Sequence, residues 1–509
     1  MCQSQSEFKW MNELHDKFPE KYQGADVLDV GSANLNGNYR PFFSRWGANK
    51  YTGIDVLPFN NVDIVSPVHL YNPDKQYDIV FSASQLEHDM YWKKTLLKFI
   101  ELCKSGGMII ISAWCALDFH GTKEEQPLTS LTSNLDNEWA HYYENRLVKD
   151  IQKVWTKKLL KKTFSDYFLG MNPHDDGNVV FWGGKKMTIN FVGLFNAPGY
   201  VGEISDETHI ARELEKLGHT VNRVQRDVWK AYCDGEMDNN WNLPIPDVDI
   251  NLIAKWHHFN DGKYVHVLSG GAPVFYWVWD YMPNPTIPSW HLEMAKAADL
   301  YLSGEAGIFD QYKKEGVKPY YFQMDVCDGD LNNDFPYLEK KYDVVFTGSC
   351  IDQGHRKEYL QIINKEVPVT IFAWNWEEWQ KLGFTAYPAI YGEEYNNIIA
   401  QTRIVLGFSV EPNCWGYWSN RVGKVIRAGG FLLQEYAPGM ETQLPLAGVD
   451  YFSSPEEAIE KIKHYLIQKP VVDRANEERF TSRDLVKRLT ILMERYLKSN
   501  NGKDWNKLP

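Results

Sequence analysis

The sequence predicts an α/β protein built from three Rossmann-like units in series. Three sets of short apolar runs alternate with helical stretches, and each new set begins where the previous one closes. Such runs, separated by helical segments, indicate parallel sheets with helical crossovers. A chain of 509 residues has room for roughly two to four domains. We expect domains at residues 1–186, 187–335 and 336–509.

The first block contains the strand-like runs "ADVLDVG", "KYTGIDV", "YDIVFSAS" and "MIIISAW". A helix is predicted over residues 91–107, "YWKKTLLKFIELCKSGG", ending at its Gly-Gly pair. The block closes near "GNVVFWGGKK", at about residues 178–186.

The second block starts directly afterwards with the strand "MTINFVGLF" and the helix "SDETHIARELEKLGHTV". Ser205 or Asp206 can cap this helix, and Gly218 stands where a helix usually stops. Strand, capped helix and strand together predict a new βαβ unit.

The third block starts at residues 341–349, "KYDVVFTGS", after a loop rich in Asp, Asn, Gly and Pro at 324–340. This loop lacks the terminal Glu of a calcium site, so we interpret it as an interdomain hinge. Near the end of the block, Ser454 and Glu457 form a predicted capping box, with Pro455 at the first helical position.

Charge and cysteine content disfavour proteins that bind through a broad basic surface and proteins held by disulfides or a metal. The net charge of −13 disfavours binding through a broad basic surface, although a local basic groove for nucleic acid stays open. The seven cysteines include no CxxC pair and no metal-ligand spacing, so we expect reduced thiols and no metal. We expect no membrane span and a cytoplasmic protein.

The first strand ends in a glycine turn of the kind that binds a cofactor. In "VLDVGSANLNGNYR" the apolar strand stops at Gly31, where the backbone can approach a ligand closely. Asp55 ends the second strand, where a carboxylate binds ribose hydroxyls. These residues alone fit NAD and S-adenosylmethionine equally.

The string "FSASQLEH", followed by a helix ending in "CKSGGMIIIS", resembles the class I S-adenosylmethionine-dependent methyltransferases. The resemblance covers about residues 20–186 and includes the glycine turn, although Ala33 and Leu35 replace glycines of the fuller pattern. It implies S-adenosylmethionine-binding residues in three groups: Asp29, Gly31, Ser32 and Asn34 beside the methionine moiety, Asp55 at the ribose, and Ser82, Ala83, Ser84 and Gln85 on the sulfonium side.

Two further polar residues have alternative roles in this block. His88 follows the fourth strand, where a base for the methyl acceptor could stand, or it forms only structural hydrogen bonds. Arg40 steers an anionic acceptor or pairs with a nearby acid.

The remaining two blocks resemble the GT-B glycosyltransferases, especially the CgeB-like group related to family 4. The resemblance rests on "VFTGSCIDQGHRKEYL", "VFYWVWDYMP" and "SNRVGKVIRAGGFLLQEYAPGM", and it covers about residues 187–490. It implies a nucleotide-diphosphate sugar as donor, with Gly348, Ser349, Arg356, Arg421 and Gly430 near the diphosphate and Asp280 in the cleft as a base or acceptor-holding residue. The glycines around Gly199 form a candidate anion- or sugar-binding loop.

One position departs from the glycosyltransferase pattern. Where the family carries the Glu that holds the donor ribose, this chain has Lys424. A cation cannot accept hydrogen bonds from ribose hydroxyls, so the donor is bound differently, Glu435 serves instead, or this half is inactive.

The leading hypothesis is a bifunctional transferase that adds a sugar and a methyl group to one glycan or glycosylated acceptor, in surface-sugar biosynthesis. The first alternative is a methyltransferase with a non-catalytic, carbohydrate-binding tail. The second is an enzyme that modifies nucleic-acid bases, which needs only a small basic rim around its pocket.

Overall fold

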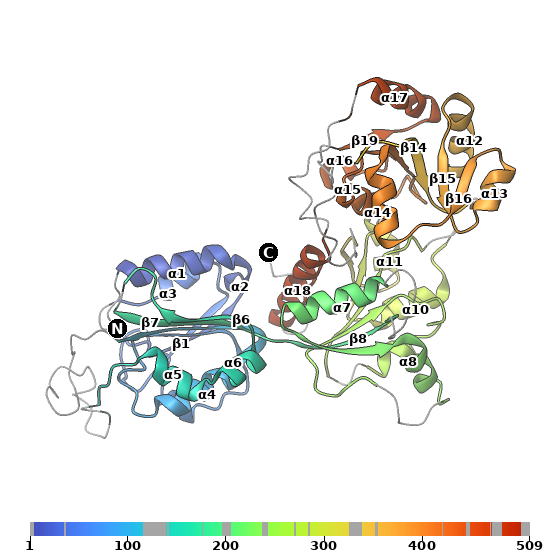
Figure 1. The fold of residues 1–509 in the computed structure, drawn as a ribbon. Coiled ribbons are helices and arrows are strands. Elements are labelled where there is room, and N and C mark those ends of the chain that lie inside the picture. Colours follow the sequence, from blue (N-terminus) through green and yellow to red (C-terminus); the bar gives the residue numbers. More distant parts are fainter. Residues whose placement is uncertain are drawn as a thin grey trace. The chain divides into compact units, whose positions relative to one another are not determined.

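The computed structural model places the chain in two compact units (Figure 1). The first comprises residues 1–188, 216–220 and 490–509, and the second comprises residues 189–215 and 221–489. The structure describes residues 5–34, 37–115, 139, 142–175, 177–195, 205–236, 243–268, 271–282, 286–324, 338–351, 355–419, 421–443, 448–468, 470 and 481–499.

A seven-stranded sheet in the order β3-β2-β1-β4-β5-β7-β6 forms the centre of the first unit. Its strands are β1 (Asp26–Val30), β2 (Lys50–Asp55), β3 (Ile64–Val65), β4 (Tyr77–Ala83), β5 (Cys103–Trp114), β6 (Phe164–Met171) and β7 (Asn178–Lys185). The five strands from β3 to β5 are parallel, whereas β7 runs antiparallel to both β5 and β6.

Helices cover both faces of this sheet, because its central strands are apolar on both sides (Figure 1). One core cluster joins the sheet to the helices before β2, namely α1 (Gln5–Lys17), α2 (Pro19–Tyr22) and α3 (Arg40–Arg45). A second cluster joins the other face to α4 (Trp92–Leu102), α5 (Val148–Val154), α6 (Lys157–Thr163) and the turn η1 (Val68–Leu70).

The helix predicted over residues 91–107 is shorter in the structure. It ends at Leu102, and β5 begins at Cys103, which pairs with Tyr77 of β4. The register shifts beyond this pair, and a Cβ on Gly107 would lie 2.7 Å from the carbonyl oxygen of Asp78. Residues 103–107, which the sequence pattern assigned to the helix, therefore belong to β5, because pairing with β4 outweighs their local helix propensity.

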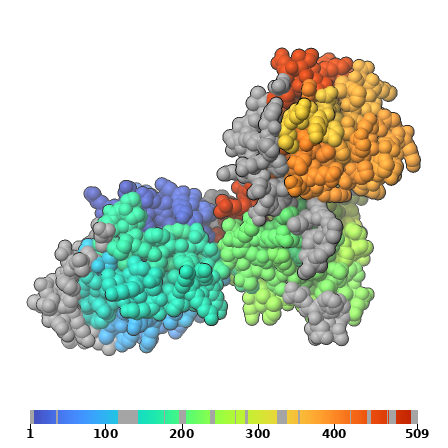
Figure 2. All heavy atoms as spheres, in the orientation of Figure 1, coloured from blue at the N-terminus to red at the C-terminus, as the bar shows by residue number. Residues whose placement is uncertain are grey.

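The N-terminal helix α1 is fixed against the β6–β7 turn of the same unit. Glu13 forms an ion pair with His174 at 2.7 Å, and the Ser6 hydroxyl donates to Asp175. In Figure 2 the blue atoms of the N-terminal region accordingly adjoin the teal atoms of this later segment.

The second unit begins with a parallel six-stranded sheet in the order β13-β12-β11-β10-β8-β9. Its strands are β8 (Thr188–Gly193), β9 (Thr220–Gln225), β10 (Ile250–Ala254), β11 (Val274–Val278), β12 (Leu300–Ser303) and β13 (Pro319–Tyr321). Its helices are α7 (Asp206–Lys216), α8 (Arg226–Cys233), α9 (Lys263–His266), α10 (Ser289–Ala297), η3 (Ala306–Ile308) and α11 (Phe309–Lys314).

A second parallel sheet in this unit has the order β16-β15-β14-β17-β18-β19. Its strands are β14 (Tyr342–Thr347), β15 (Thr370–Ala373), β16 (Thr385–Pro388), β17 (Thr402–Gly407), β18 (Leu432–Glu435) and β19 (Val449–Phe452). Its helices are α12 (Arg356–Glu366), α13 (Trp376–Lys381), α14 (Gly392–Ala400), α15 (Arg421–Arg427), α16 (Met440–Gln443) and α17 (Pro455–Ile467). The predicted fold class, with three α/β sheets in series, is confirmed.

The predicted helix caps are present in the second unit. The Ser205 hydroxyl accepts the Thr208 amide at 3.2 Å at the start of α7, and Gly218 after its end has φ +91°. At α17 the Ser454 hydroxyl accepts the Glu457 amide at 3.2 Å. The Glu457 carboxylate, however, accepts the amide of Ser453 at 2.8 Å, one residue before the position that a capping box predicts.

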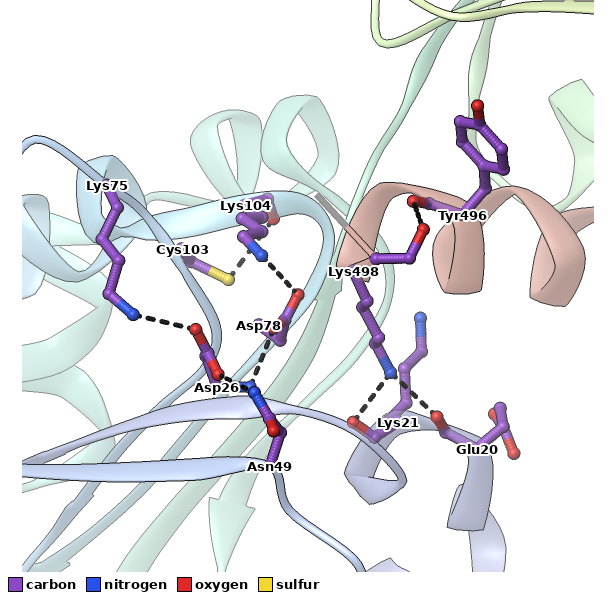
Figure 3. A network of polar contacts seen from close by, with 11 residues as sticks. Glu20, Lys21, Asp26, Asn49, Lys75, Asp78, Cys103, Lys104, Tyr496 and Lys498 are labelled. Carbon is purple, nitrogen blue, oxygen red and sulfur yellow. Dashed lines mark hydrogen bonds and ion pairs between the residues drawn. The ribbon is translucent and has the colours of Figure 1, made fainter. Parts of the chain in front are cut away.

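The last helix, α18 (Ser482–Lys498), contributes its residues from 490 onward to the first unit. Figure 3 shows the Lys498 ammonium group, which donates to the carbonyl oxygens of Glu20 at 2.8 Å and Lys21 at 3.0 Å. Lys21 in turn forms an ion pair with Glu494 at 2.5 Å, with only 13% and 6% of the two side chains exposed. Burial lowers the pKa of Lys498 to about 8.

Removal of this end of α18 is expected to destabilise the first unit. A chain ending at residue 489 loses the buried side chains of Leu492 and Met493. Two such losses cost about 5 kcal/mol or more and lower the thermal midpoint by on the order of 10 °C. Scanning calorimetry checks this against a control chain that ends at residue 499. Equal midpoints for the two truncated chains would contradict the expectation.

Candidate functional site

A pocket of about 620 Å³, including the part open to solvent, lies at the carboxyl end of the first sheet. It stands where β1 and β4 are neighbours and the connections leave in opposite directions, which is the position where open α/β sheets bind ligands. Its lining consists of Val30, Gly31, Ala33, Ile54, Asp55, Val56, Leu57, Ser66, Pro67, Val68, Ser84, Gln85, His88, Asp89 and Trp139.

Two backbone positions at the pocket have conformations that few residues adopt. Gly31 has φ +81°, and a Cβ there would lie 2.4 Å from Cγ of Gln85. Ser84, which is not a glycine, has φ +48°, and its amide donates to the Ser112 carbonyl at 2.8 Å. Such strain collects at functional sites, where the surrounding structure holds it. Glycine is required at position 31 so that the Gln85 side chain can pack against the turn.

The Asp55 carboxylate is held by backbone donors at the edge of the pocket. One oxygen accepts the Ala33 amide and the other accepts the Leu57 amide, both at 3.0 Å. The Val56 amide is a third backbone donor to this carboxylate, whose two oxygens together offer about four acceptor sites, so acceptor capacity is left for a ligand hydroxyl. Burial raises the pKa of this carboxyl, and the backbone donors act in the opposite direction.

The loop after β4 carries the polar side chains on the other side of the pocket. Asp89, 1% exposed, accepts the Thr95 hydroxyl at 2.5 Å and the Gln85 amide group at 3.2 Å. The His88 ring packs edge-on against the Tyr143 ring, with centroids 4.9 Å apart. Gln85 and His88 are thus oriented by neighbours and not by solvent.

The composition of the lining fits a nucleoside-type ligand that carries a positive charge. Val56, Leu57, Val68 and Trp139 supply an apolar wall for a base. Two carboxylates, Asp55 and Asp89, face the pocket, and none of its described lining residues is Lys or Arg.

The other residues predicted for this site lie beside the pocket and not in its lining. Asp29 is fully buried and accepts the Tyr51 hydroxyl; Ser32, Ser82 and Ala83 are also fully buried. The Asn34 side chain accepts the Gly37 amide at 3.1 Å and holds the turn. Arg40 pairs with Asp63 at 2.6 Å, so of its two alternatives the structure shows the structural one.

A second candidate site lies at the carboxyl end of β14, where two arginines approach one aromatic ring. The guanidinium carbons of Arg356 and Arg421 lie 5.7 Å and 5.6 Å from the Phe346 ring centroid. Burial, and then the charge of Arg421, lower the pKa of Arg356 to about 10. Neither guanidinium forms an ion pair with a carboxylate of the described residues, although the charge of Glu435 acts against the lowering of the Arg356 pKa.

Backbone groups of the predicted turn lie beside these arginines. The Ser349 carbonyl accepts from Arg356 at 3.4 Å, and a Cβ on Gly348 would lie 3.3 Å from Nη2 of Arg421. Lys424 lies one turn further along α15. Gly430 has a packing role, since a Cβ there would lie 2.6 Å from the Ile399 side chain.

Glu435 ends β18 with 2% of its surface exposed. Its carboxylate accepts from Nδ1 of His355 at 2.8 Å and from the Ser409 amide at 3.3 Å. Burial raises the pKa of Glu435, and the His355 hydrogen bond opposes this shift.

The remaining predicted residues belong to the first sheet of the second unit. Asp280 follows β11, is 57% exposed and forms an ion pair with Lys255 at 2.5 Å. Gly199 lies outside the described residues.

Sequence reasoning missed Trp139, Asp89 and His355. Trp139 stands in no recognisable pattern, since a tertiary approach alone brings it to its site, whereas His355 directly precedes Arg356 in the quoted string "VFTGSCIDQGHRKEYL". Asp89 had a signal, because it directly follows the "LEH" segment and precedes the helix that its carboxylate helps to begin.

Two families match parts of the chain. Residues 3–164 match the family described as a methyltransferase domain, and residues 356–483 match the family described as glycosyl transferase-like. The chain thus carries an N-terminal methyltransferase domain and a glycosyltransferase-like domain, and it is an enzyme. The second unit contains two six-stranded sheets, and the glycosyl transferase-like match begins at Arg356, the first residue of α12 beside the second of these sheets. No curated protein matches the chain in sequence.

Three solved structures illustrate the similarity. A glycosyltransferase involved in avilamycin A biosynthesis is 12% identical, with 62% of this chain and 98% of that chain covered and a TM-score of 0.40. HepE from Anabaena, in complex with UDP and glucose, is 12% identical over 62% of this chain and 100% of its own, with a TM-score of 0.38. The 1,6-didemethyltoxoflavin-N1-methyltransferase of Burkholderia thailandensis is 14% identical over 36% of this chain and 78% of its own, with a TM-score of 0.26.

The methyltransferase domain implies S-adenosylmethionine as methyl donor, and the pocket tests this implication. It fits, because the apolar wall suits adenine, the Asp55 carboxylate suits ribose hydroxyls, and the absence of Lys and Arg among the described lining residues suits a sulfonium ion.

Gly31→Ala is expected to weaken binding of S-adenosylhomocysteine at least about tenfold, because the new Cβ displaces Gln85 and strains the turn. Titration calorimetry measures the change. Gly235→Ala is the control, since Gly235 also has a positive φ, +76°, but a Cβ there meets nothing within 4 Å. A Kd for Gly31→Ala equal to that of the control would refute the packing argument.

Three buried carboxyls make the stability of the first unit depend on pH. Burial raises the pKa values of Glu7, Asp29 and Glu87 to about 7. The folded state therefore binds more protons than the unfolded state between about pH 4 and pH 7, and stability falls as pH rises through this window.

Glu7→Gln should remove one part of this dependence, because glutamine does not ionise. Between about pH 5 and pH 7.5 the wild type is expected to lose up to about 3 kcal/mol more of unfolding free energy than the variant. Urea unfolding at the two pH values measures it, with the exposed Glu101→Gln as control. Parallel losses in wild type and Glu7→Gln would contradict the assignment.

Proposed function

We propose that the chain is a bifunctional transferase. It moves a methyl group from S-adenosylmethionine and a sugar from a nucleotide-diphosphate sugar onto one glycan or glycosylated acceptor, in surface-sugar biosynthesis in the cytoplasm. The observation that carries the proposal is the pairing, in one chain, of a pocket whose described lining residues include no Lys or Arg with two neighbouring arginines, Arg356 and Arg421, that form no ion pair with a carboxylate of the described residues.

In the methyltransferase pocket, S-adenosylmethionine supplies an electrophilic methyl group when it is bound. Asp55 accepts hydrogen bonds from the ribose hydroxyls, while Leu57, Val68 and Trp139 cover the base. Gly31 lets the backbone approach the ligand. The Gln85 side chain, from the loop after the neighbouring strand β4, packs against the turn at Gly31. Asp29, Ser32, Asn34, Ser82 and Ala83 lie beside the lining and support the turn.

His88 is the candidate general base for a hydroxyl acceptor, because it is the imidazole in the pocket lining and its ring is oriented by Tyr143. With the methyl donor bound, His88 would take the proton that the acceptor hydroxyl loses when its oxygen replaces the sulfonium sulfur at the methyl carbon and the sulfur leaves as a neutral thioether.

In the glycosyltransferase half, Arg356 and Arg421 hold the donor diphosphate. Planar guanidinium groups donate two parallel, charge-assisted hydrogen bonds to phosphate oxygens, and the anion offsets the cost of burying both cations. Lys424 adds a third positive charge on α15, the helix that also carries Arg421. Glu435 replaces the ribose-binding carboxylate, since each of its oxygens keeps a lone pair after bonding to His355 or Ser409.

Asp280 contributes from the acceptor side. Its carboxylate, which forms an ion pair with Lys255, can accept a hydrogen bond from an acceptor hydroxyl and hold that hydroxyl in place. Covalent fusion of the two activities raises the effective concentration of the second for the product of the first.

Thermal-shift assays with S-adenosylmethionine, S-adenosylhomocysteine and a panel of nucleotides and nucleotide sugars test the proposal. A ligand at about 100 times its Kd stabilises the folded protein by roughly 2.7 kcal/mol. Shifts with both an adenosyl compound and one nucleoside diphosphate support two working sites. A shift with the adenosyl compound alone overturns the glycosyl half and makes the second unit an acceptor-binding tail.

Arg421→Met is expected to weaken binding of UDP, GDP or dTDP, whichever binds the wild type, by about 10- to 100-fold. The substitution removes a guanidinium group that donates charge-assisted hydrogen bonds to the phosphate. Calorimetric titration provides the measurement. Arg403→Met is the control, since Arg403 is exposed on β17 of the same sheet. Equal affinity of both variants would remove Arg421 from the donor site.

A further inference from the structure

A short segment at residues 142–147 fastens the loop that carries His88. The Nε of Arg146 donates to the Leu86 carbonyl at 2.9 Å, and the Glu144 amide donates to the Glu87 carbonyl at 2.8 Å. A longer contact of 3.5 Å joins Nη2 of Arg146 to the Asp89 carbonyl. The backbone on both sides of His88 is thus bound by one neighbouring segment.

Arg146 is itself held from several directions. Its guanidinium is 1% exposed and lies 4.7 Å from the Trp92 ring centroid. It donates to the Glu144 carboxylate at 2.7 Å and to the Tyr142 hydroxyl at 2.7 Å. The hydrogen bond from Arg146 lowers the pKa of Glu144. The guanidinium therefore has a fixed orientation before it contacts the loop.

The same segment reaches the pocket directly. Tyr143 packs edge-on against the His88 ring, and the Arg146 amide donates to the Trp114 carbonyl at the end of β5 with a length of 2.9 Å. Segment 142–147 thus connects the end of β5, the loop after β4 and the candidate base.

We infer that Arg146 is a positioning residue for methyl transfer: through the carbonyls of Leu86 and Asp89 it fixes the loop that presents Gln85, His88 and Asp89 to the pocket. This inference rests on the proposed use of the pocket for S-adenosylmethionine. The guanidinium is a planar group with five N–H bonds. Some of these N–H groups reach the two carbonyls, while the remaining ones bind Glu144 and Tyr142, and no other side chain offers so many donors.

A purely structural role for Arg146 predicts a different set of results. A buried arginine that only packs under α4 would affect stability and leave His88 and ligand affinity unchanged. Two readouts separate the roles: the affinity for S-adenosylhomocysteine, and the NMR signal of the ¹³C-labelled His88 ring followed by pH titration in the absence of ligand.

In the full chain, Arg146→Met is expected to weaken S-adenosylhomocysteine binding at least about tenfold, because buried charge-assisted hydrogen bonds are lost. The titration midpoint of His88 is expected to move as its ring loses its fixed surroundings. Arg146→Lys should fall between Arg146→Met and the wild type, since an ammonium group can reach one carbonyl but not both.

Leu160→Ala is the control matched for stability. It removes a buried side chain of α6 in the same unit, away from the pocket, and should lower the thermal midpoint without changing either readout. Wild-type values for both readouts in Arg146→Met would overturn the inference.

If Arg146→Met does not fold, Arg146→Lys and Tyr142→Phe replace it as the test variants. Unchanged readouts in both of these variants would likewise overturn the inference. A wild-type protein that fails to bind S-adenosylhomocysteine contradicts the proposed function. The His88 titration then still tests the positioning role by itself.

Discussion

Both candidate sites depend on one constraint of parallel sheets, the divergence of two connections at a central strand. In the first sheet the chain crosses to β2 on one side of β1 and returns to β4 on the other. The carboxyl ends of β1 and β4 are therefore adjacent, with no connecting helix between them. Gly31 and Gln85 meet there, and the pocket forms around them. The sheet of β14 and β17 repeats this geometry and places Gly348 beside Arg421.

Buried carboxyls and buried guanidinium groups are tolerated in different ways, and the difference follows from the chemistry of the groups. The carboxyls of Glu7, Asp29 and Glu87 can take up a proton when burial raises their pKa values, so the first unit tolerates them as neutral groups. Guanidinium groups do not lose their proton at neutral pH, so Arg356 and Arg421 stay charged. Two neighbouring guanidinium groups, of which Arg356 is buried, favour an anion beside them.

The first unit is not one continuous stretch of sequence. Residues 490–499 supply Leu492, Met493 and Tyr496 to its core, and Lys498 caps the carbonyls at the end of α2. Close to the active pocket, segment 142–147 has a similar relation to the loop of His88. In both cases a distant part of the chain provides the polar partners that a local segment cannot provide for itself.

The sequence alone determined the three α/β sheets, the capped helices and the turn at Gly31, because these depend on local periodicity and on residues with special backbone geometry. It overextended the helix before β5, since pairing with β4 overrides local propensity there. Only the tertiary structure decided that Arg40 pairs with Asp63, that Trp139 joins the pocket, and that Arg356 and Arg421 share one ring. Those contacts join residues far apart in sequence, and no local pattern encodes which side chains the folded sheets bring together.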